Sequence, residues 1–171
     1  VLLQTYSPIE IIVVNANCRD NIGEFYSDHT PIRSIISNEP LKRSAAANAG
    51  LNNASGEYII FLDDDDLFEI DHIEKLALAL AENPQAVAAY SGVRCSTFHQ
   101  DIEETPPLRI FNDPFNAARL LYENYIPIHA LLFRSQACGK DGDCKFDENI
   151  DIFEDWDFFL QMLQMGEFIH H

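Results

Sequence analysis

The sequence is poor in basic residues. Its 11 Lys and Arg stand against 28 Asp and Glu, which gives a formal net charge of −17 at pH 7. A chain this negative repels polyanions, so we expect no nucleic-acid partner, and an anionic ligand needs a metal ion or a few local cations for compensation. The sequence also has no apolar run of about 18 residues and nothing that resembles a signal peptide. We therefore expect no membrane segment and a cytoplasmic domain, with attachment to the inner face of a membrane through a longer parent chain left open.

Cysteine is scarce as well, and none of the four cysteines belongs to a CxxC pair. In a cytosolic protein such residues are ordinarily reduced thiols. A zinc site built from Cys138, Cys144 and His129 is conceivable, but its spacing matches no common zinc finger, so we disfavour it. Internal repeats, low-complexity tracts and linkers are also missing, while 47% of the residues are hydrophobic. These features indicate one globular domain that spans residues 1–171.

The most informative stretch is an apolar run at residues 58–62 that is followed at once by four carboxylates at residues 63–66. Large and β-favouring residues bounded by Gly56 and by charge are typical of a strand buried on both faces. Ligands of open α/β sheets bind at the carboxyl ends of strands, and oxygen ligands suit Mg²⁺ or Mn²⁺. The alternative is that the acids only form a solvated turn. An EF-hand loop is excluded, because Phe68 stands where that loop requires glycine.

Strand-like segments alternate with helix-like segments along the chain. The expected strands are residues 10–14, 32–36, 58–62, 87–93 and 126–133, and the expected helices are residues 41–51, 71–82, 113–125 and 150–165. The polar residues 96–107 are expected to run over the surface. This alternation predicts an α/β domain with a mainly parallel sheet.

Several further side chains are candidates for binding. Lys42 and Arg43 fall in the first turn of an expected helix, where cations oppose the helix dipole, so they either serve an anionic ligand or are solvated surface charges. His129 interrupts an expected strand and is more typical of a core or rim histidine than of a ligand. Glu154 and Asp155 lie at the start of the last helix, where negative charge is favourable, so their position alone does not indicate catalysis.

Four segments together resemble family 2 glycosyltransferases of the GT-A fold. In chain order they read QTYSPIEIIVVNANCRD, KRSAAANAGLNNASGEYIIFLDDDD, IHALLFRSQ and FDENIDIFEDWDFFLQML. The resemblance spans nearly the whole chain and implies a three-layer α/β sandwich with a mainly parallel central sheet. The family's first strand and helix would precede Val1, so the resemblance implies a domain that is partial at its amino terminus, with its carboxyl terminus left open. A neighbouring copy in a homodimer is one way to fill the place of the missing strand.

The resemblance implies transfer of a sugar from a nucleotide-sugar donor, most often a UDP-sugar, to an acceptor hydroxyl with inversion. The acceptor would be a carbohydrate or a lipid-linked glycan, as in the synthesis of cell-surface polysaccharides and glycoconjugates. Such enzymes use Mn²⁺ or Mg²⁺ to neutralise charge on the departing diphosphate. Two alternatives stay open: a sugar-nucleotide nucleotidyltransferase, although no glycine-rich loop with basic residues is visible, and a non-catalytic binding module derived from a transferase.

The resemblance also implies roles for single residues. Asp63 and Asp65 fall on the family's DxD motif, so Asp65 would coordinate the metal ion while Asp63, with Asp64 beside it, would face the donor. Asp155 matches the family's general base, which removes the proton of the attacking hydroxyl.

The remaining assignments are to donor binding and to secondary positions. Asn15 and Ala16 stand where the family usually carries a pair of aspartates, so Asn15 would bond the edge of the nucleobase without charge. Lys42 and Arg43 would lie near the nucleobase or the phosphates. The secondary candidates, which would support the base or bind metal or phosphate, are Glu154, Asp157, His129 and His170.

Overall fold

The computed structural model describes residues 1–17, 27, 29–99, 102–103, 107–138 and 143–171. The strands are β1 (Ile11–Asn15), β2 (Ile32–Ile36), β3 (Tyr58–Ile60), β4 (Ala86–Tyr90), β5 (Val93–Cys95), β6 (Phe98–His99), β7 (Ile102–Glu103), β8 (Arg109–Phe111), β9 (Leu131–Arg134) and β10 (Glu167–His170). The helices are α1 (Arg43–Asn53), α2 (His72–Glu82), α3 (Ala117–Leu120) and α4 (Glu154–Leu163), with the 3₁₀ turns η1 (Ile128–Ala130) and η2 (Ser135–Ala137). The expected α/β class is confirmed. Within these residues, no helix is both long enough and apolar enough to cross a bilayer.

The central sheet has four strands in the order β10-β4-β9-β3. β10 is parallel to β4, whereas β9 is antiparallel to both β4 and β3. It follows that β3, β4 and β10 run in one direction and β9 opposes them. Three of the four strands therefore share one direction, and β9 is the exception, because an apolar pattern shows that a strand is buried but not which way it runs.

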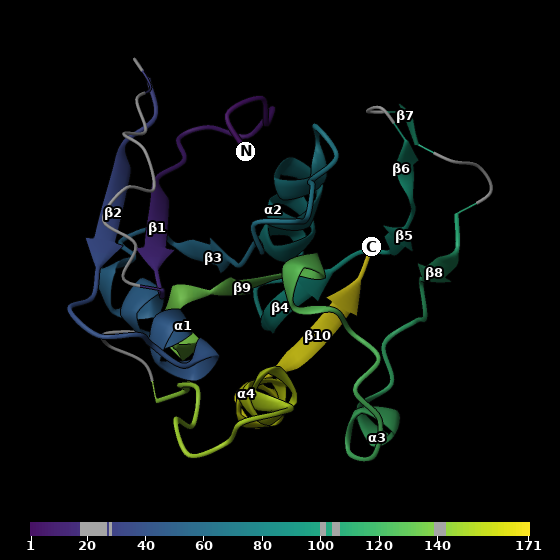
Figure 1. The fold of residues 1–171 in the computed structure, drawn as a ribbon. Helices are drawn as coiled ribbons and strands as arrows, with labels where there is room; N and C mark the ends of the chain where they lie inside the picture. The colour runs from purple at the N-terminus through teal and green to yellow at the C-terminus, as the bar shows by residue number, and fades with distance from the viewer. Residues whose placement is uncertain (18–26, 28, 100–101, 104–106, 139–142) are drawn as a thin grey trace.

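Helices cover both faces of this sheet, as Figure 1 shows. On one face, Leu76 and Leu80 of α2 share a core cluster with Leu132 of β9. On the other face, Phe158 of α4 packs against Phe133 of β9, with the ring centroids 5.5 Å apart. Successive residues of β9 thus serve opposite layers, as the two-residue period of a strand requires. Burying a side chain such as Phe158 stabilises a fold by about 1.5–3 kcal/mol, and these two layers complete a three-layer sandwich.

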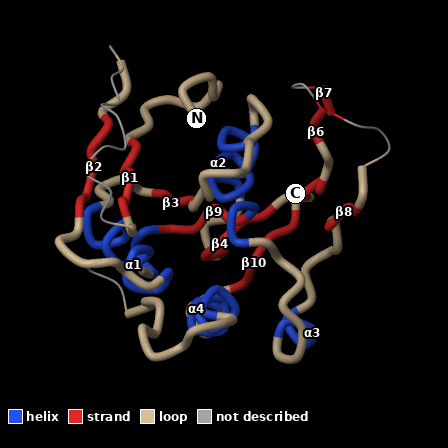
Figure 2. Tube along the Cα trace, in the orientation of Figure 1, coloured by secondary structure: helices blue, strands red, loops and turns tan. Residues whose placement is uncertain are grey.

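β1 and β2 form a separate parallel sheet of two strands, which Figure 2 shows beside α1. α1 packs against β1, where Gly50 faces Val14. Glu10, directly before β1, accepts hydrogen bonds from the backbone N–H groups of Ser55 and Gly56, which precede β3. Among the residues described above, β1 pairs only with β2 and β3 pairs only with β9. Each of these two strands therefore has one edge without a partner strand.

The helix expected over residues 113–125 is wrong in extent. Only the single turn α3 forms, because the Asn116 side chain accepts a hydrogen bond from the Arg119 N–H and caps the helix at that point. Pro114 is a good first residue for a helix, but Phe115 beside it stacks on Phe168 with the ring centroids 5.3 Å apart. Tertiary packing therefore overrides the local start signal.

Other boundaries in the carboxyl-terminal half also differ from expectation. The strand expected over residues 126–133 begins at Leu131, and His129 lies in η1 instead. The strand expected over residues 87–93 divides into β4 and β5 around Gly92. The helix expected from residue 150 begins at Glu154, because Phe153 has a left-handed backbone with φ 65° and ψ 24°. β10 has four residues, too few for its pattern to be recognised in the sequence.

Candidate active site

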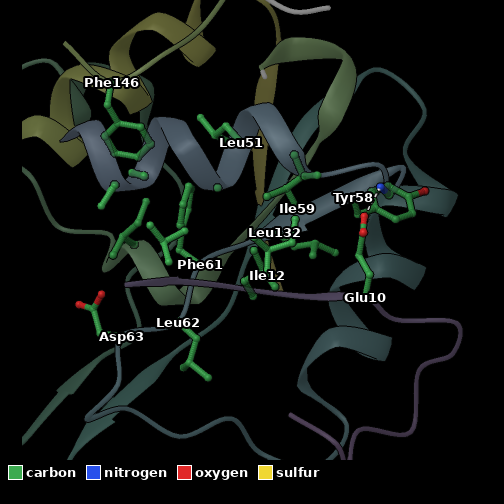
Figure 3. Close-up of a pocket in the computed structure, with 18 of the residues that line it drawn as sticks. Glu10, Ile12, Leu51, Tyr58, Ile59, Phe61, Leu62, Asp63, Leu132 and Phe146 are labelled. Atoms are coloured by element: carbon green, nitrogen blue, oxygen red, sulfur yellow. Dashed lines mark hydrogen bonds between the residues drawn. The ribbon is translucent and has the colours of Figure 1, made fainter. Parts of the chain in front are cut away.

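A cavity of about 770 Å³ lies between β1, β3, α1 and the start of α4. In Figure 3, Asp63 and Glu10 lie at opposite ends of a row of apolar side chains from β1, β3 and their neighbours. Arg43, Glu154 and Asp155 also line this cavity. The carboxylates that follow β3 and those that begin α4 are therefore brought to one space, although about ninety residues of chain separate them.

The Glu10 end of the cavity has a structural role. Burial raises the pKa of Glu10, but hydrogen bonds from the N–H and the hydroxyl of Ser55 and from Arg33 outweigh burial and hold the pKa below its usual value. These contacts join the start of β1 to the turn before β3. This end of the cavity is thus occupied by ionic and hydrogen-bonded partners of its own.

Asp63, Asp65 and Asp66 form an acidic cluster just after β3. One oxygen atom from each side chain lies within 4.8 Å of the others. The Asp66 N–H donates to the Asp63 carbonyl at 3.3 Å, which folds the acidic run into a turn, and His129 Nδ1 lies 3.0 Å from Asp66 Oδ2. Carboxylates this close repel one another unless a cation holds them. Their oxygen atoms, two sets of them exposed to solvent, suit Mg²⁺ or Mn²⁺, which keep several water ligands, so the cluster could hold one such ion.

Asp66 rather than Asp64 completes this cluster. From the sequence, Asp64 is expected beside the donor and Asp66 is given no role. In the structure Asp64 is exposed and lies outside the cluster, whereas Asp66 is half-buried and paired with His129. The spacing within the acidic run could not show this difference, because the partner of Asp66 comes from η1.

Arg43 connects the two groups of carboxylates. Its Nε lies 3.1 Å from Glu154 Oε1, and its Nη2 lies 3.8 Å from Asp63 Oδ2. The Glu154 side chain is only 10% exposed, so Arg43 supplies the charge that a buried carboxylate requires. Arg43 is itself largely exposed, and such pairs contribute little net stability in water. Its contact with both groups therefore matters for their arrangement more than for folding.

Asp155 lies in the first turn of α4 and is half-buried. Its Oδ1 accepts the backbone N–H of Trp156 at 2.8 Å, and Asn124 Nδ2 lies 3.2 Å from each of its two oxygens. The Trp156 indole N–H donates to the Leu120 carbonyl at 2.7 Å, which fixes this end of α4. An ionised carboxylate can accept several hydrogen bonds, so Asp155 can receive a hydroxyl from the cavity in addition.

The other residues predicted for donor binding lie partly beside this cavity and partly away from it. Asn15 is buried at the end of β1, and the neighbouring Ala16 and Asn17 line the cavity. Lys42 pairs with the exposed Asp151 at 2.7 Å and is not among the lining residues. Of the two cations expected near the donor, Arg43 therefore lines the cavity, whereas Lys42 faces a different partner.

The secondary candidates also have partners of their own. Asp157 Oδ2 accepts a hydrogen bond from Gln161 at 2.7 Å. His170 is the last residue of β10, and its Nε2 lies 2.9 Å from Asn112 Oδ1. Burial lowers the pKa of this histidine. Cys138 and Cys144 are buried free thiols, and within the described ranges only the aspartate cluster groups enough ligands for a metal ion. The disfavoured zinc site therefore does not form there.

Comparison with known proteins identifies the family. The family model described as Glycosyl transferase family 2 matches residues 1–137. The chain is 30% identical over 171 residues to YwdF of Bacillus subtilis, an uncharacterized glycosyltransferase, covering 92% of this chain and 58% of YwdF. It is 27% identical over 176 residues to chondroitin synthase of Pasteurella multocida, covering 99% of this chain and 17% of that protein.

A solved structure agrees with the predicted fold. Residues 1–349 of TarS from S. aureus superimpose with a TM-score of 0.73 at 18% sequence identity, covering 99% of this chain and 51% of that one. The chain thus has the GT-A fold and spans 51% of TarS residues 1–349 and 58% of YwdF. Since the family model matches most of its residues, the chain belongs to glycosyl transferase family 2.

Proposed function

We propose that this domain transfers a sugar from a nucleotide-sugar donor, namely a UDP-sugar, to a hydroxyl group of an acceptor. The transfer inverts the configuration at the anomeric carbon of the sugar. The observation that carries the proposal is the shared cavity, which Asp63 after β3 and Asp155 of α4 both line. A transferase of this kind needs one group of residues for the diphosphate and another for the acceptor proton. The acidic cluster and Asp155 supply two such groups in one place.

The diphosphate end of the reaction belongs to the acidic cluster. Asp63, Asp65 and Asp66 would hold Mn²⁺ or Mg²⁺, and when bound this ion neutralises charge that grows on the departing diphosphate. Arg43 lies beside Asp63 and offers a further positive charge in a chain that has few. Because the domain is so acidic, these local positive charges are what permit an anionic donor to approach.

The acceptor end belongs to Asp155. As the acceptor hydroxyl attacks the anomeric carbon, its proton passes to the Asp155 carboxylate and a new C–O bond forms. The bond between that carbon and the diphosphate oxygen breaks, and its electron pair leaves with the diphosphate. Attack from the face opposite the leaving group inverts the configuration. Asp155 must then lie about 2.6–3.2 Å from the attacking oxygen.

The acceptor class follows from the relatives. The chondroitin synthase that this chain resembles is named for a polysaccharide, and YwdF is named a glycosyltransferase. We therefore propose a carbohydrate or lipid-linked glycan as the acceptor and polysaccharide or glycoconjugate synthesis as the pathway class.

Calorimetry tests the donor assignment. Titration of UDP into the protein should release heat in the presence of Mn²⁺ and much less in its absence, since cluster and diphosphate share the ion. CDP and GDP serve as matched controls for the base. If UDP binds equally well with and without the metal, or fails to bind at all, the donor assignment is wrong.

Turnover of Asp155→Asn tests the base. We expect UDP release from a UDP-sugar to fall by about 10²–10⁴-fold while UDP binding stays near the wild-type value. Asp143→Asn changes an exposed carboxylate outside the cavity and should leave both quantities unchanged. UDP binding in a wild-type protein without any turnover would instead favour a non-catalytic module.

A further inference from the structure

Asn124 holds the Asp155 carboxylate from outside α4. Its Nδ2 lies 3.2 Å from Oδ1 and 3.2 Å from Oδ2 of Asp155. An ionised carboxylate can only accept hydrogen bonds, so the amide must turn its NH₂ group toward Asp155 and its carbonyl away. One nitrogen is therefore shared between both carboxylate oxygens, which leaves lone pairs on each of them for a substrate.

The chain around Asn124 is fixed on both sides. Tyr125, the next residue, is buried, and its hydroxyl accepts the Asn116 N–H at 2.8 Å. On the preceding side, the Leu120 carbonyl accepts the Trp156 indole N–H at 2.7 Å. The segment that carries Asn124 is thus attached to the same end of α4 that carries Asp155. Its amide is presented by a rigid support rather than by a free loop.

The other amide atom of Asn124 indicates why an amide stands here. Asn124 Oδ1 is buried and has no hydrogen-bond partner within the described part of the protein. A buried acceptor without a partner destabilises the folded state, so folding alone favours an apolar side chain at this position. What the amide provides in exchange is its pair of contacts to Asp155.

We infer that Asn124 is a positioning residue for Asp155, an assignment that rests on the proposed function. Its shared NH₂ group fixes the plane of the carboxylate relative to the cavity. Asn124 does not touch the reacting atoms. It acts by keeping Asp155 in the orientation that the transfer requires.

The charged groups around Asp155 are each engaged elsewhere. The pairs are Glu154 with Arg43, Asp157 with Gln161, and Glu123 with Arg119. Replacing Asn124 therefore removes a neutral hydrogen-bond donor from Asp155 and disturbs no ion pair.

Asn124→Leu separates a positioning role from a structural one. Loss of the buried Oδ1 should leave the melting temperature equal to or above that of wild type. Loss of the NH₂ group should lower kcat for UDP release from UDP-sugars by about tenfold to a hundredfold. The reason is that a base displaced by about 1 Å from its productive position is much less efficient. UDP binding should stay near the wild-type value, so the loss falls on kcat and not on donor affinity. Asn124→Ala carries the same expectation without added bulk.

The assay uses UDP-glucose, UDP-galactose and their N-acetylhexosamine counterparts with Mn²⁺, and follows the donor that wild type hydrolyses fastest. Asn83→Leu is the matched control: the Asn83 amide donates to the Ala79 carbonyl at 2.9 Å near the end of α2, so this change should cost stability without lowering kcat. Wild-type kcat in Asn124→Leu, with UDP binding retained, overturns the positioning role alone. Absence of UDP release by wild type from every donor overturns the proposed function, and this inference with it.

Discussion

At the scale of single residues, the four aspartates at residues 63–66 differ in the side chains that they contact, although they are adjacent in the sequence. Asp66 is paired with His129 and shares the cluster with Asp63 and Asp65, whereas Asp64 is exposed outside it. His129 restricts the Asp66 side chain before any ligand arrives, which lowers the entropy that metal binding must overcome. Neighbouring aspartates of the same run are thus expected to differ sharply in their contribution to metal affinity.

Asp66→Asn should weaken Mn²⁺ binding by roughly tenfold or more, since it removes a negatively charged ligand or its close support. Asp64→Asn removes the same charge from an adjacent residue and should change the affinity by less than about twofold. Titration of Mn²⁺ followed by electron paramagnetic resonance, with UDP present, measures both. Equal losses in the two variants would show that net charge alone attracts the ion and that the cluster geometry is irrelevant.

His72, the first residue of α2, gives a second prediction at this scale. Burial lowers the pKa of its imidazole below the ordinary value of 6.5. The unfolded chain then binds a proton at His72 more readily than the folded chain does, so folding stability falls as the pH drops through about 6.5 and is unaffected by His72 well above it. Between pH 7.5 and pH 5.5, wild type should therefore lose more stability than His72→Phe.

Urea unfolding at the two pH values measures this difference. His29 is exposed, so His29→Phe is a matched control that should keep the wild-type dependence on pH. An identical loss in wild type and His72→Phe would mean that other groups cause the pH dependence.

At the scale of elements, the start of α4 is the point of local strain. Phe153 is the N-cap residue, has φ 65°, makes no side-chain cap and remains 57% exposed. Its ring contacts Trp156 edge-on at 5.9 Å, which offsets part of the cost. A left-handed backbone costs an L-residue about 1–2 kcal/mol, and glycine avoids that cost. The backbone here is therefore held by its surroundings and not by Phe153 itself.

Phe153→Gly and Phe153→Ala isolate this strain. Both variants lose the ring contact, but only glycine relieves the backbone, so Phe153→Gly should be more stable than Phe153→Ala by about 1 kcal/mol. For a domain of this size the difference corresponds to about 2–4 °C in melting temperature. A melting temperature for the alanine variant equal to or above that of the glycine variant would contradict a strained N-cap.

The elements differ in how far the sequence could predict them. β1, β2, α1, β3 and α2 lie close to their expected ranges, because the three strands are rich in β-favouring apolar residues, α1 is rich in strong helix formers and α2 has one apolar face. α3 and the start of α4 could not be placed, since Asn116 and Phe153 end or delay a helix through contacts and backbone geometry that no pattern records. In the same way, the strand-end aspartates were recognisable, but the contact between Asn124 and Asp155 joins residues 31 positions apart. Pairing across elements is decided by the packed fold.

At the scale of the whole molecule, the sheet is open between β1 and β3. The residues described in the structure give each of these strands one partner strand only, and the space between them is the middle of the cavity. That middle is lined by apolar side chains such as Ile12, Val14, Ile59 and Phe61, which suit a polypeptide strand better than a nucleotide. The polar groups for a nucleotide-sugar lie at the Asp63 end. We propose that a further apolar strand fills the middle and leaves that end for the donor.

Extending the chain at its amino terminus by such a strand should raise the melting temperature by more than about 5 °C, because a paired and buried strand adds several kcal/mol of apolar burial. Hydrogen exchange should show new protection of backbone amides in β1 and β3. Ile12→Lys should abolish most of this gain in the extended chain while having a smaller effect on residues 1–171, where Ile12 is only half-buried. If residues 1–171 alone form a dimer that protects the same amides, a second copy fills the space instead. If the extension leaves both strands unprotected, the middle of the cavity belongs to a ligand and not to a strand.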